Sequence, residues 1–210
     1  MTRKNFLSLA LSLAVTVITG ASLVAFAPAP TAIGSAAPSF TLTDLDGKSH
    51  SLADFKGKTV VLEWTNPNCP FVVAHYKSNN MQSLQKKYTD KGVVWLAVNS
   101  TNDQSGEFMS VADLKKNRTE WKSAYTAQLI DADGKVGRLY NAKTTPHMFI
   151  VDKDGKLVYQ GGIDDAAGTS GGKDAKVNYV AQALDAVLAG KEVPTATTKS
   201  YGCSVKYATK

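Results

Sequence analysis

Cys69 is the residue whose surroundings point most directly to chemistry. It follows a near-continuous apolar run at 59–64, typical of a strand buried on both faces, and precedes a helix whose first turn holds Pro70. The unpaired N–H groups and positive end of a helix stabilise a thiolate, so they lower the pKa of the thiol and make it more nucleophilic. We therefore predict that Cys69 is a reactive nucleophile, with a buried and inert cysteine as the alternative.

Cys203 is the only other cysteine in the sequence and follows Cys69 by 134 positions. The preceding Gly202 gives the backbone freedom to turn this thiol toward a partner. A disulfide closing so long a loop would stabilise the fold by about 4–5 kcal/mol, so the spacing fits a structural disulfide as well as a redox-active pair or two unpaired thiols. Two cysteines exclude a disulfide-dense scaffold, and with three histidines they leave few ligands for a metal, so no metal site is predicted.

The elements that must position these residues alternate between strands and helices. Alternating or apolar patterns predict strands at 40–44 and 93–98, and helical spacing from Val73 to Tyr88 predicts a single helix that ends at Gly92. A strand, a helix and a second strand in this order predict parallel pairing through a right-handed crossover. The remaining expected elements are short ones at 111–116, 129–130 and 134–140, strands at 147–152 and 156–160 joined at Asp154-Gly155, and a final helix at 173–189. The predicted fold class is mixed α/β.

The charges and the first residues of the chain bear on location. Lys and Arg number 24 against 18 Asp and Glu, and the few arginines are scattered, which argues against a nucleic-acid reader. Arg3 and Lys4 precede an uncharged stretch at 6–27, the pattern of a secretory signal peptide that is also long enough to span a bilayer. We therefore expect an exported protein, periplasmic or otherwise extracytoplasmic, with membrane contact only through an uncleaved leader.

The same patterns divide the chain into four parts. Residues 1–27 are predicted to be the signal peptide or membrane anchor, 28–37 a flexible linker, 38–190 the folded domain, and 191–210 a tail that carries Cys203. Within the domain, a Gly-rich stretch at 161–172 lacks the strand and helix context of a phosphate-binding loop. We expect it to be a flexible surface loop.

Three segments resemble those of proteins with a thioredoxin fold. Residues 60–72 (VVLEWTNPNCPFV) resemble its active-site region, and residues 144–152 (TTPHMFIVD) resemble its cis-proline segment. Residues 37–58 are similar to the opening segment of redoxins, the group that includes peroxiredoxins and exported thiol–disulfide oxidoreductases. The resemblance implies a thioredoxin-like fold, with a central mixed β-sheet flanked by helices, over about residues 37–190.

The cysteine positions depart from two redoxin patterns. Thioredoxins carry Cys-x-x-Cys, whereas Val72 fills the second position here. Peroxiredoxins carry Pro-x-x-x-Thr/Ser-x-x-Cys, whereas Leu62 and Asn66 stand before Cys69 at those spacings. The chain most resembles a peroxiredoxin-like branch, of the alkyl hydroperoxide reductase and thiol-specific antioxidant type, with an Asn-x-x-Cys-Pro-Phe signature and a late Gly-Cys-Ser-x-Lys segment.

Two further residues are expected to be catalytic: Cys203 as a hypothesis drawn from its place in the tail, and Glu63 by the resemblance. Cys203 would supply the resolving thiol that is missing at position 72, with the tail folded over Cys69. Glu63 would relay protons, and burial in an apolar strand should raise the pKa of its carboxyl group toward neutrality. The alternative for Glu63 is a place at a polar edge or in an ion pair with a lysine.

Other residues are expected to position the substrate or to tune the thiol. By resemblance Pro146 is a cis-proline, which would set the backbone of Thr145 beside Cys69 to pair with an incoming chain. Asn66 and Pro70 shape the turn around Cys69. Two histidines, His75 and His147, are candidate neighbours of the thiol, although a lone histidine is more often a packed or surface residue.

We therefore expect an exported thiol–disulfide oxidoreductase or antioxidant redoxin that needs no cofactor. Its substrate would be a protein or small-molecule disulfide or a peroxide, and an external thiol reductant would restore the enzyme. The alternative is a non-enzymatic redoxin-fold module that binds a partner or handles copper through Cys69, His75 and His147, with the two cysteines joined in a structural disulfide.

Overall fold

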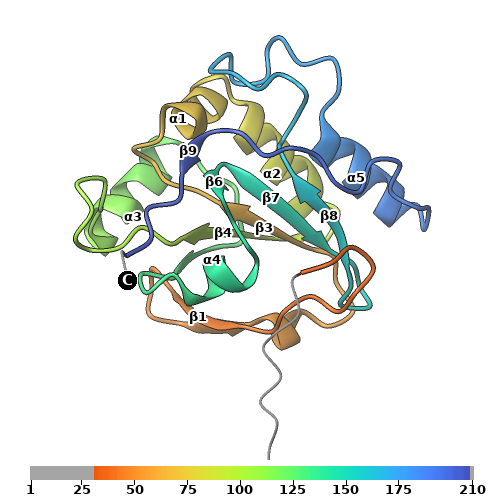
Figure 1. Cartoon of the computed structure of the whole chain (residues 1–210), viewed down its shortest axis with the longest axis horizontal. Helices are drawn as coiled ribbons and strands as arrows, with labels where there is room; N and C mark the ends of the chain where they lie inside the picture. Colours follow the sequence, from red (N-terminus) through yellow and green to blue (C-terminus); the bar gives the residue numbers. More distant parts are fainter. Residues whose placement is uncertain (1–30, 209–210) are drawn as a thin grey trace, which may run out of the picture.

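The computed structural model describes residues 31–208 and has a seven-stranded sheet at its centre (Figure 1). The strands of this sheet are β1 (Thr41–Asp44), β2 (Ser49–Ser51), β3 (Val60–Trp64), β4 (Val94–Asn99), β5 (Ala127–Ile130), β7 (His147–Val151) and β8 (Leu157–Gly161). The helices are the 3-10 helix η1 (Leu52–Phe55), α1 (Pro70–Lys77), α2 (Asn80–Thr89), α3 (Val111–Glu120), α4 (Lys135–Leu139) and α5 (Tyr179–Leu188). A second, two-stranded sheet joins β6 (Thr144–Thr145) to β9 (Cys203–Ser204).

The strand order β2-β1-β5-β4-β3-β7-β8 makes the central sheet mixed. Strand β4 runs parallel to both β3 and β5, whereas β7 is antiparallel to β3 and to β8. Every residue of β3 and β4 is buried, as the continuous apolar runs predict for strands covered on both faces. The predicted thioredoxin-like fold, a mixed sheet flanked by helices, is confirmed.

Side chains that alternate along β3 enter different cores on the two faces of the sheet. Val61 packs with the helical residues of α1, α2 and α5, including Tyr76, Met81 and Leu184. Val60, Leu62 and Trp64 pack on the other face, in a core that also contains Val136 of α4 and packs against Leu42 of β1. Because both faces are covered, the carboxyl end of β3 is held in place, and the turn that carries Cys69 begins there.

The helix that follows Cys69 is broken in two, so the prediction of one helix up to Gly92 was wrong. Asn79 lies between α1 and α2 in the left-handed region, at φ 62° and ψ 14°. Asparagine tolerates this conformation better than most residues, so it can end one helix and start another. The apolar spacing continues across the break because both helices bury residues in the same core.

The last helix is also shorter than predicted. It begins at Tyr179 rather than 173, because Asn178 caps it by accepting a hydrogen bond from the N–H of Ala181 at 2.8 Å. Before Asn178 the backbone bonds to the Gly-rich loop instead of to a helix, because the N–H groups of Lys176 and Val177 donate to the carboxylate of Asp165 at 2.9 Å and 3.1 Å. The expected Gly-rich surface loop is fastened to α1, since Ser78 donates a hydrogen bond to the carbonyl of Gly171 at 2.6 Å.

Both ends of the described chain pack on the body. Residues 31–37, the described part of the expected linker, bond to the β7–β8 hairpin, where the N–H of Gly34 donates to the carbonyl of Leu157 at 2.8 Å. The tail returns along β8, with Thr197 bridged to Gln160, and then crosses to β6 (Figure 1). The expected leader, residues 1–27, lies outside the described residues. Within 31–208, no helix combines the length and the apolar character that crossing a bilayer requires.

Candidate active site

Cys69 occupies the N-cap of α1, directly after the turn that follows β3. Its carbonyl accepts the first helical hydrogen bond from the N–H of Val73 at 2.9 Å, and Pro70 stands at the start of the helix, where no N–H is needed. The side chain is fully buried, and its thiol donates to the carbonyl oxygen of Thr145 at 2.9 Å. The Thr145-Pro146 peptide bond is cis. The structure thus brings Cys69, Pro70, Thr145 and Pro146 together.

Asn66 shapes the turn that presents Cys69. Its side-chain oxygen accepts from the N–H of Asn68 at 2.8 Å, and its carbonyl accepts from the N–H of Cys69 at 3.0 Å. Such side-chain-to-backbone bonds are how asparagine stabilises a tight turn. Asn66 therefore lies beside the thiol as an organiser of the local backbone.

Cys203 lies opposite Thr145 in the small antiparallel sheet. Residue pairs Thr145–Cys203 and Thr144–Ser204 define the register between β6 and β9. Gly202 has φ +127°, and a Cβ atom at this position would collide with the carbonyl of Thr145. Only glycine fits this close approach of two backbones, which explains the residue before Cys203. Both cysteines are free thiols in this structure.

The two thiols differ in acidity. Burial is the largest influence on Cys69 and raises its pKa, but hydrogen bonds from the Cys203 thiol and from the N–H of Val72 outweigh it, so the pKa lies below its ordinary value. Burial and the neighbouring Cys69 sulfur raise the pKa of Cys203 to about 12. The two pKa values therefore shift in opposite directions, so Cys69 is the thiol of the pair that loses its proton more readily.

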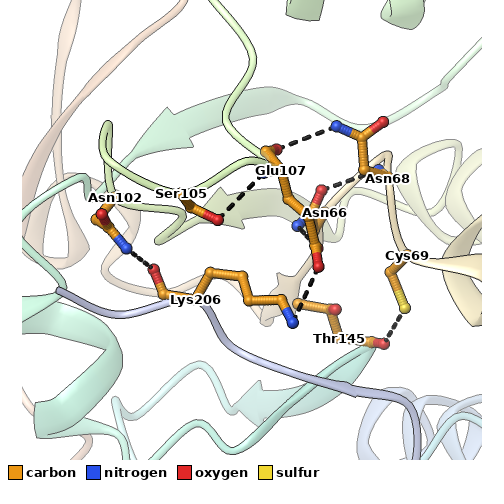
Figure 2. A network of polar contacts seen from close by, with 8 residues as sticks. All are labelled: Asn66, Asn68, Cys69, Asn102, Ser105, Glu107, Thr145 and Lys206. Carbon is orange, nitrogen blue, oxygen red and sulfur yellow. Dashed lines mark hydrogen bonds and ion pairs between the residues drawn. The ribbon is translucent and has the colours of Figure 1, made fainter. Parts of the chain in front are cut away.

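Glu107 connects the active-site turn to the tail (Figure 2). One carboxylate oxygen accepts from the side-chain amide of Asn66 at 2.8 Å, and the other pairs with the ammonium group of Lys206 at 2.9 Å. The carbonyl of Glu107 accepts from the side chain of Asn68 at 3.1 Å. The sequence pointed to Lys206 only as the last residue of the Gly-Cys-Ser-x-Lys segment and did not point to Glu107, because the contact between them spans a long distance along the chain.

Tyr201 anchors the tail between α1 and the Gly-rich loop. Its hydroxyl donates to the carboxylate of Asp164 at 2.7 Å and accepts from His75 Nε2 at 3.0 Å. His75 Nδ1 accepts from the side-chain amide of Asn80 at 2.8 Å, so the imidazole carries its proton on Nε2. Burial lowers the pKa of His75 to about 4, which keeps the ring neutral. The structure thus places His75 against the tail, without a hydrogen bond to Cys69 among residues 31–208.

Glu63 lies in the core behind α1, away from the thiol contacts. Its carboxylate accepts hydrogen bonds from Tyr76 at 3.1 Å, Gln85 at 3.0 Å and Trp95 at 2.7 Å. Burial raises the pKa of Glu63, although these hydrogen bonds oppose the shift. The direction matches the expectation for a carboxyl group in an apolar strand, but within the described residues no hydrogen bond joins Glu63 to Cys69.

His147 follows the cis-proline and faces the core. Its Nδ1 accepts from the N–H of Lys143 at 3.2 Å, and its ring packs against Phe149 with centroids 4.4 Å apart. Burial lowers the pKa of His147 to about 4. In the part of the chain that the structure describes, no group of three or more His, Cys, Asp or Glu side chains could hold a metal ion.

Comparison with known proteins gives this geometry a family context. The family model described as Redoxin matches residues 32–177. A curated relative, the thiol-disulfide oxidoreductase ResA of Bacillus thuringiensis subsp. konkukian, is 33% identical over 130 residues, which cover 61% of this chain and 68% of that protein. This relative is therefore, by its name, a thiol–disulfide oxidoreductase.

Two solved structures of proteins described without a function match most of the chain. The hypothetical protein SMc02350 of Sinorhizobium meliloti is 29% identical with a TM-score of 0.76, over 87% of this chain and 98% of that one. An uncharacterised conserved protein of Geobacillus kaustophilus is 31% identical with a TM-score of 0.74, over 85% of this chain and 94% of that one. With the family match over most of its length, the chain belongs to the Redoxin family.

Proposed function

We propose that this protein is an exported thiol–disulfide oxidoreductase in which Cys69 is the nucleophile and Cys203 the resolving thiol. One observation carries the proposal: Cys203 pairs through its backbone with Thr145, whose carbonyl contacts the Cys69 thiol. The unequal acidities of the two thiols support the assignment, because the thiolate is the attacking species. The family and its thiol–disulfide oxidoreductase members support the reaction class.

The reaction begins when the Cys69 thiolate attacks a substrate disulfide. A mixed disulfide forms on Cys69, and the other substrate sulfur leaves as a thiolate. Cys203 then attacks the Cys69 sulfur, its proton passes to the departing substrate thiolate, and an intramolecular disulfide results. Two equivalents of an external thiol restore both cysteines and leave as one disulfide.

A peroxide substrate would enter the same cycle at a different point, as the resemblance to a peroxiredoxin-like branch suggests. The Cys69 thiolate would attack the peroxide oxygen to give a sulfenic acid, and the leaving oxygen would take a proton to become water or an alcohol. Cys203 would condense with the sulfenic acid, releasing water and forming the same disulfide. The resolving step is therefore common to both substrates.

The surrounding residues have supporting roles in this proposal. Asn66 and Pro70 hold the turn and the start of α1, so they position the Cys69 sulfur. The Thr145 backbone, set by Pro146, aligns the partner strand. Glu63 lies in the core behind α1, so any proton that it relays to Cys69 must pass through the groups between them. The uncharged stretch after Arg3 and Lys4 supports export to a compartment where both redox states of the thiols are accessible.

The decisive experiment maps the thiols of the purified protein by mass spectrometry across a series of glutathione redox buffers. We expect a Cys69–Cys203 disulfide that forms and breaks within the range of catalytic pairs, and a stable mixed disulfide or sulfenic acid on Cys69 in the Cys203→Ser variant. A bond that resists millimolar dithiothreitol in the folded protein would contradict the cycle. So would a wild-type protein in which the two cysteines never join.

A further inference from the structure

A cleft of about 530 Å³ runs along α1, beside the active-site turn. Its lining residues from α1 are Pro70, Val73, Ala74 and Lys77, which share one helical face. Pro67 and Asn68 close one end, so the cleft reaches the residues that flank Cys69 in sequence. The opposite wall is formed by Ser170 of the Gly-rich loop and by Lys173, which directly follows that loop.

The loop wall is part of the fold. Ser78 at the end of α1 donates to the carbonyl of Gly171 at 2.6 Å. A Cβ atom at Gly171 would collide with the carbonyl of Ala74, so the loop backbone lies directly on the helix. Because these contacts fix the loop against α1, Ser170 and Lys173 are held at the cleft.

The polar groups at the cleft suit an anion. Lys77 and Lys173 are the charged residues among those that line it, and neither forms an ion pair within residues 31–208. The hydroxyl oxygen of Ser170 is buried and has no hydrogen-bond partner in the described structure. A buried hydroxyl without a partner costs free energy, and a ligand that accepts its hydrogen bond would recover it.

We propose that this cleft binds a short, anionic thiol peptide that acts as the reductant of the Cys69–Cys203 disulfide, an inference that rests on the proposed function. The seven residue steps from Pro70 to Lys77 span about 10 Å along the helix axis, at about 1.5 Å per residue. An extended peptide covers this distance with about three residues. With a carboxylate between Lys77 and Lys173, a tripeptide therefore extends along the cleft to Asn68 and Pro70, the two residues that flank Cys69.

The redox step balances with two molecules of this thiol. The first thiolate attacks the protein disulfide, forming a mixed disulfide with one cysteine and releasing the other as a thiolate, which takes a proton. The second thiolate attacks the mixed disulfide, releases the second cysteine and leaves as the symmetrical peptide disulfide. The cleft residues bind and orient the peptide and take no part in bond exchange.

The test compares the rates at which three thiols reduce the oxidised full-length protein. Glutathione is an anionic peptide, 2-mercaptoethanol is neutral, and cysteamine is cationic. At low salt, we expect glutathione to reduce the Lys77→Glu/Lys173→Glu double variant about tenfold more slowly than the wild type. The rate of reduction by 2-mercaptoethanol should be unchanged, and the rate with cysteamine should rise. A matched control, Lys116→Glu/Lys153→Glu, makes the same change in net charge outside the cleft.

Two outcomes would overturn the inference: an unchanged ratio of glutathione to 2-mercaptoethanol rates in the cleft variant, or an equal loss in the control. Ser170→Ala adds an independent test. It should lower the rate of reduction by glutathione, while the stability of the protein should be unchanged or slightly higher. If the wild type forms no disulfide, the proposed function fails but the cleft is still tested, by titrating the reduced protein with S-methylglutathione and following NMR shifts at Lys77, Ser170 and Lys173. The absence of saturable shifts there would refute the site.

Discussion

At the scale of single residues, the acidity of Cys69 depends on its partner. The Cys203 thiol donates a hydrogen bond that favours the Cys69 thiolate against the opposing effect of burial. We therefore expect Cys203→Ala to raise the pKa of Cys69 and Cys203→Ser, which keeps a hydroxyl donor, to raise it less. Thiolate absorbance near 240 nm, recorded across pH, measures this. Equal titration curves in wild type and both variants would contradict the assignment.

Glu63 makes a second residue-scale prediction, about stability and pH. Burial raises the pKa of its carboxyl group in the folded state, so the folded protein holds this proton more tightly than the unfolded chain. The resulting stabilisation is complete below the unfolded value of 4.5 and is lost as the pH rises through the folded pKa. We expect the free energy of unfolding of Glu63→Gln to fall less over that range, as measured by urea titration at several pH values.

The matched control for this prediction is Glu120→Gln, which removes an exposed carboxylate at the end of α3. Its pH profile should follow that of the wild type. A Glu63→Gln profile parallel to the wild type would mean that the buried carboxyl group does not titrate differently on folding.

Sequence alone predicted some of these residues and not others, for physical reasons. Cys69 is visible because the junction of a buried strand and a helix leaves a local pattern. Glu107 and Tyr201 are not, because their partners lie far away along the chain and their segments have no periodicity. Lys206 is visible only as the end of the Gly-Cys-Ser-x-Lys segment, without its partner Glu107. The roles of His75 and His147 depended on which neighbours the fold supplied, and the fold gave both of them partners other than the thiol.

At the scale of elements, long apolar runs in the sequence predicted the buried strands most reliably. Strands β3 and β4 were predicted because strands covered on both faces need continuous apolar sequence. The break between α1 and α2 was missed because a single left-handed residue, Asn79, interrupts the helix without disturbing its apolar spacing. Strands β6 and β9 contain two residues each, which is too short for any period to register.

The pairing of β6 with β9 gives a prediction at this scale. Gly202→Ala places a methyl group against the carbonyl of Thr145, so β9 must move away from β6. We expect the equilibrium constant for forming the Cys69–Cys203 disulfide against glutathione to fall by at least about tenfold, since small displacements greatly reduce the effective concentration of a thiol pair. Gly168→Ala is the control, because a Cβ atom there meets nothing within 4 Å. An unchanged constant in Gly202→Ala would show that β9 does not align the thiols.

At the scale of the whole molecule, the tail ties distant parts of the chain together. It bridges to β8 through Thr197 and pairs with β6 at Cys203. The ring of Tyr207 then packs against α4, 4.5 Å from Arg138 Cζ, and its hydroxyl donates to the carbonyl of Ala142, after the helix, at 2.8 Å. The sequence analysis expected the tail to cover Cys69, but the anchoring contacts of Tyr201, Lys206 and Tyr207 emerged only from the three-dimensional arrangement. From these contacts we expect the body and the tail to unfold together.

Joint unfolding allows a global test of whether the disulfide is structural. A permanent link across so long a loop should raise the free energy of unfolding by about 4–5 kcal/mol. In a redox-active pair the stabilised thiolate favours the reduced fold, so we expect oxidised and reduced proteins to differ by less than about 3 kcal/mol. Urea unfolding with and without reductant measures the difference, using Cys203→Ser as a reference. The full value of the permanent link would identify the bond as structural.

The pairing of β6 with β9 also has a consequence for synthesis of the chain, because β9 is made long after Cys69. A ribosome adds about 5–20 residues per second, so Cys203 is synthesised roughly 7–27 s after Cys69. During that interval the nascent chain carries the proposed nucleophile, Cys69, without β9, the strand that later pairs beside it. Maturation must therefore keep the first sulfur reduced, and away from unrelated thiols, until the second one is made.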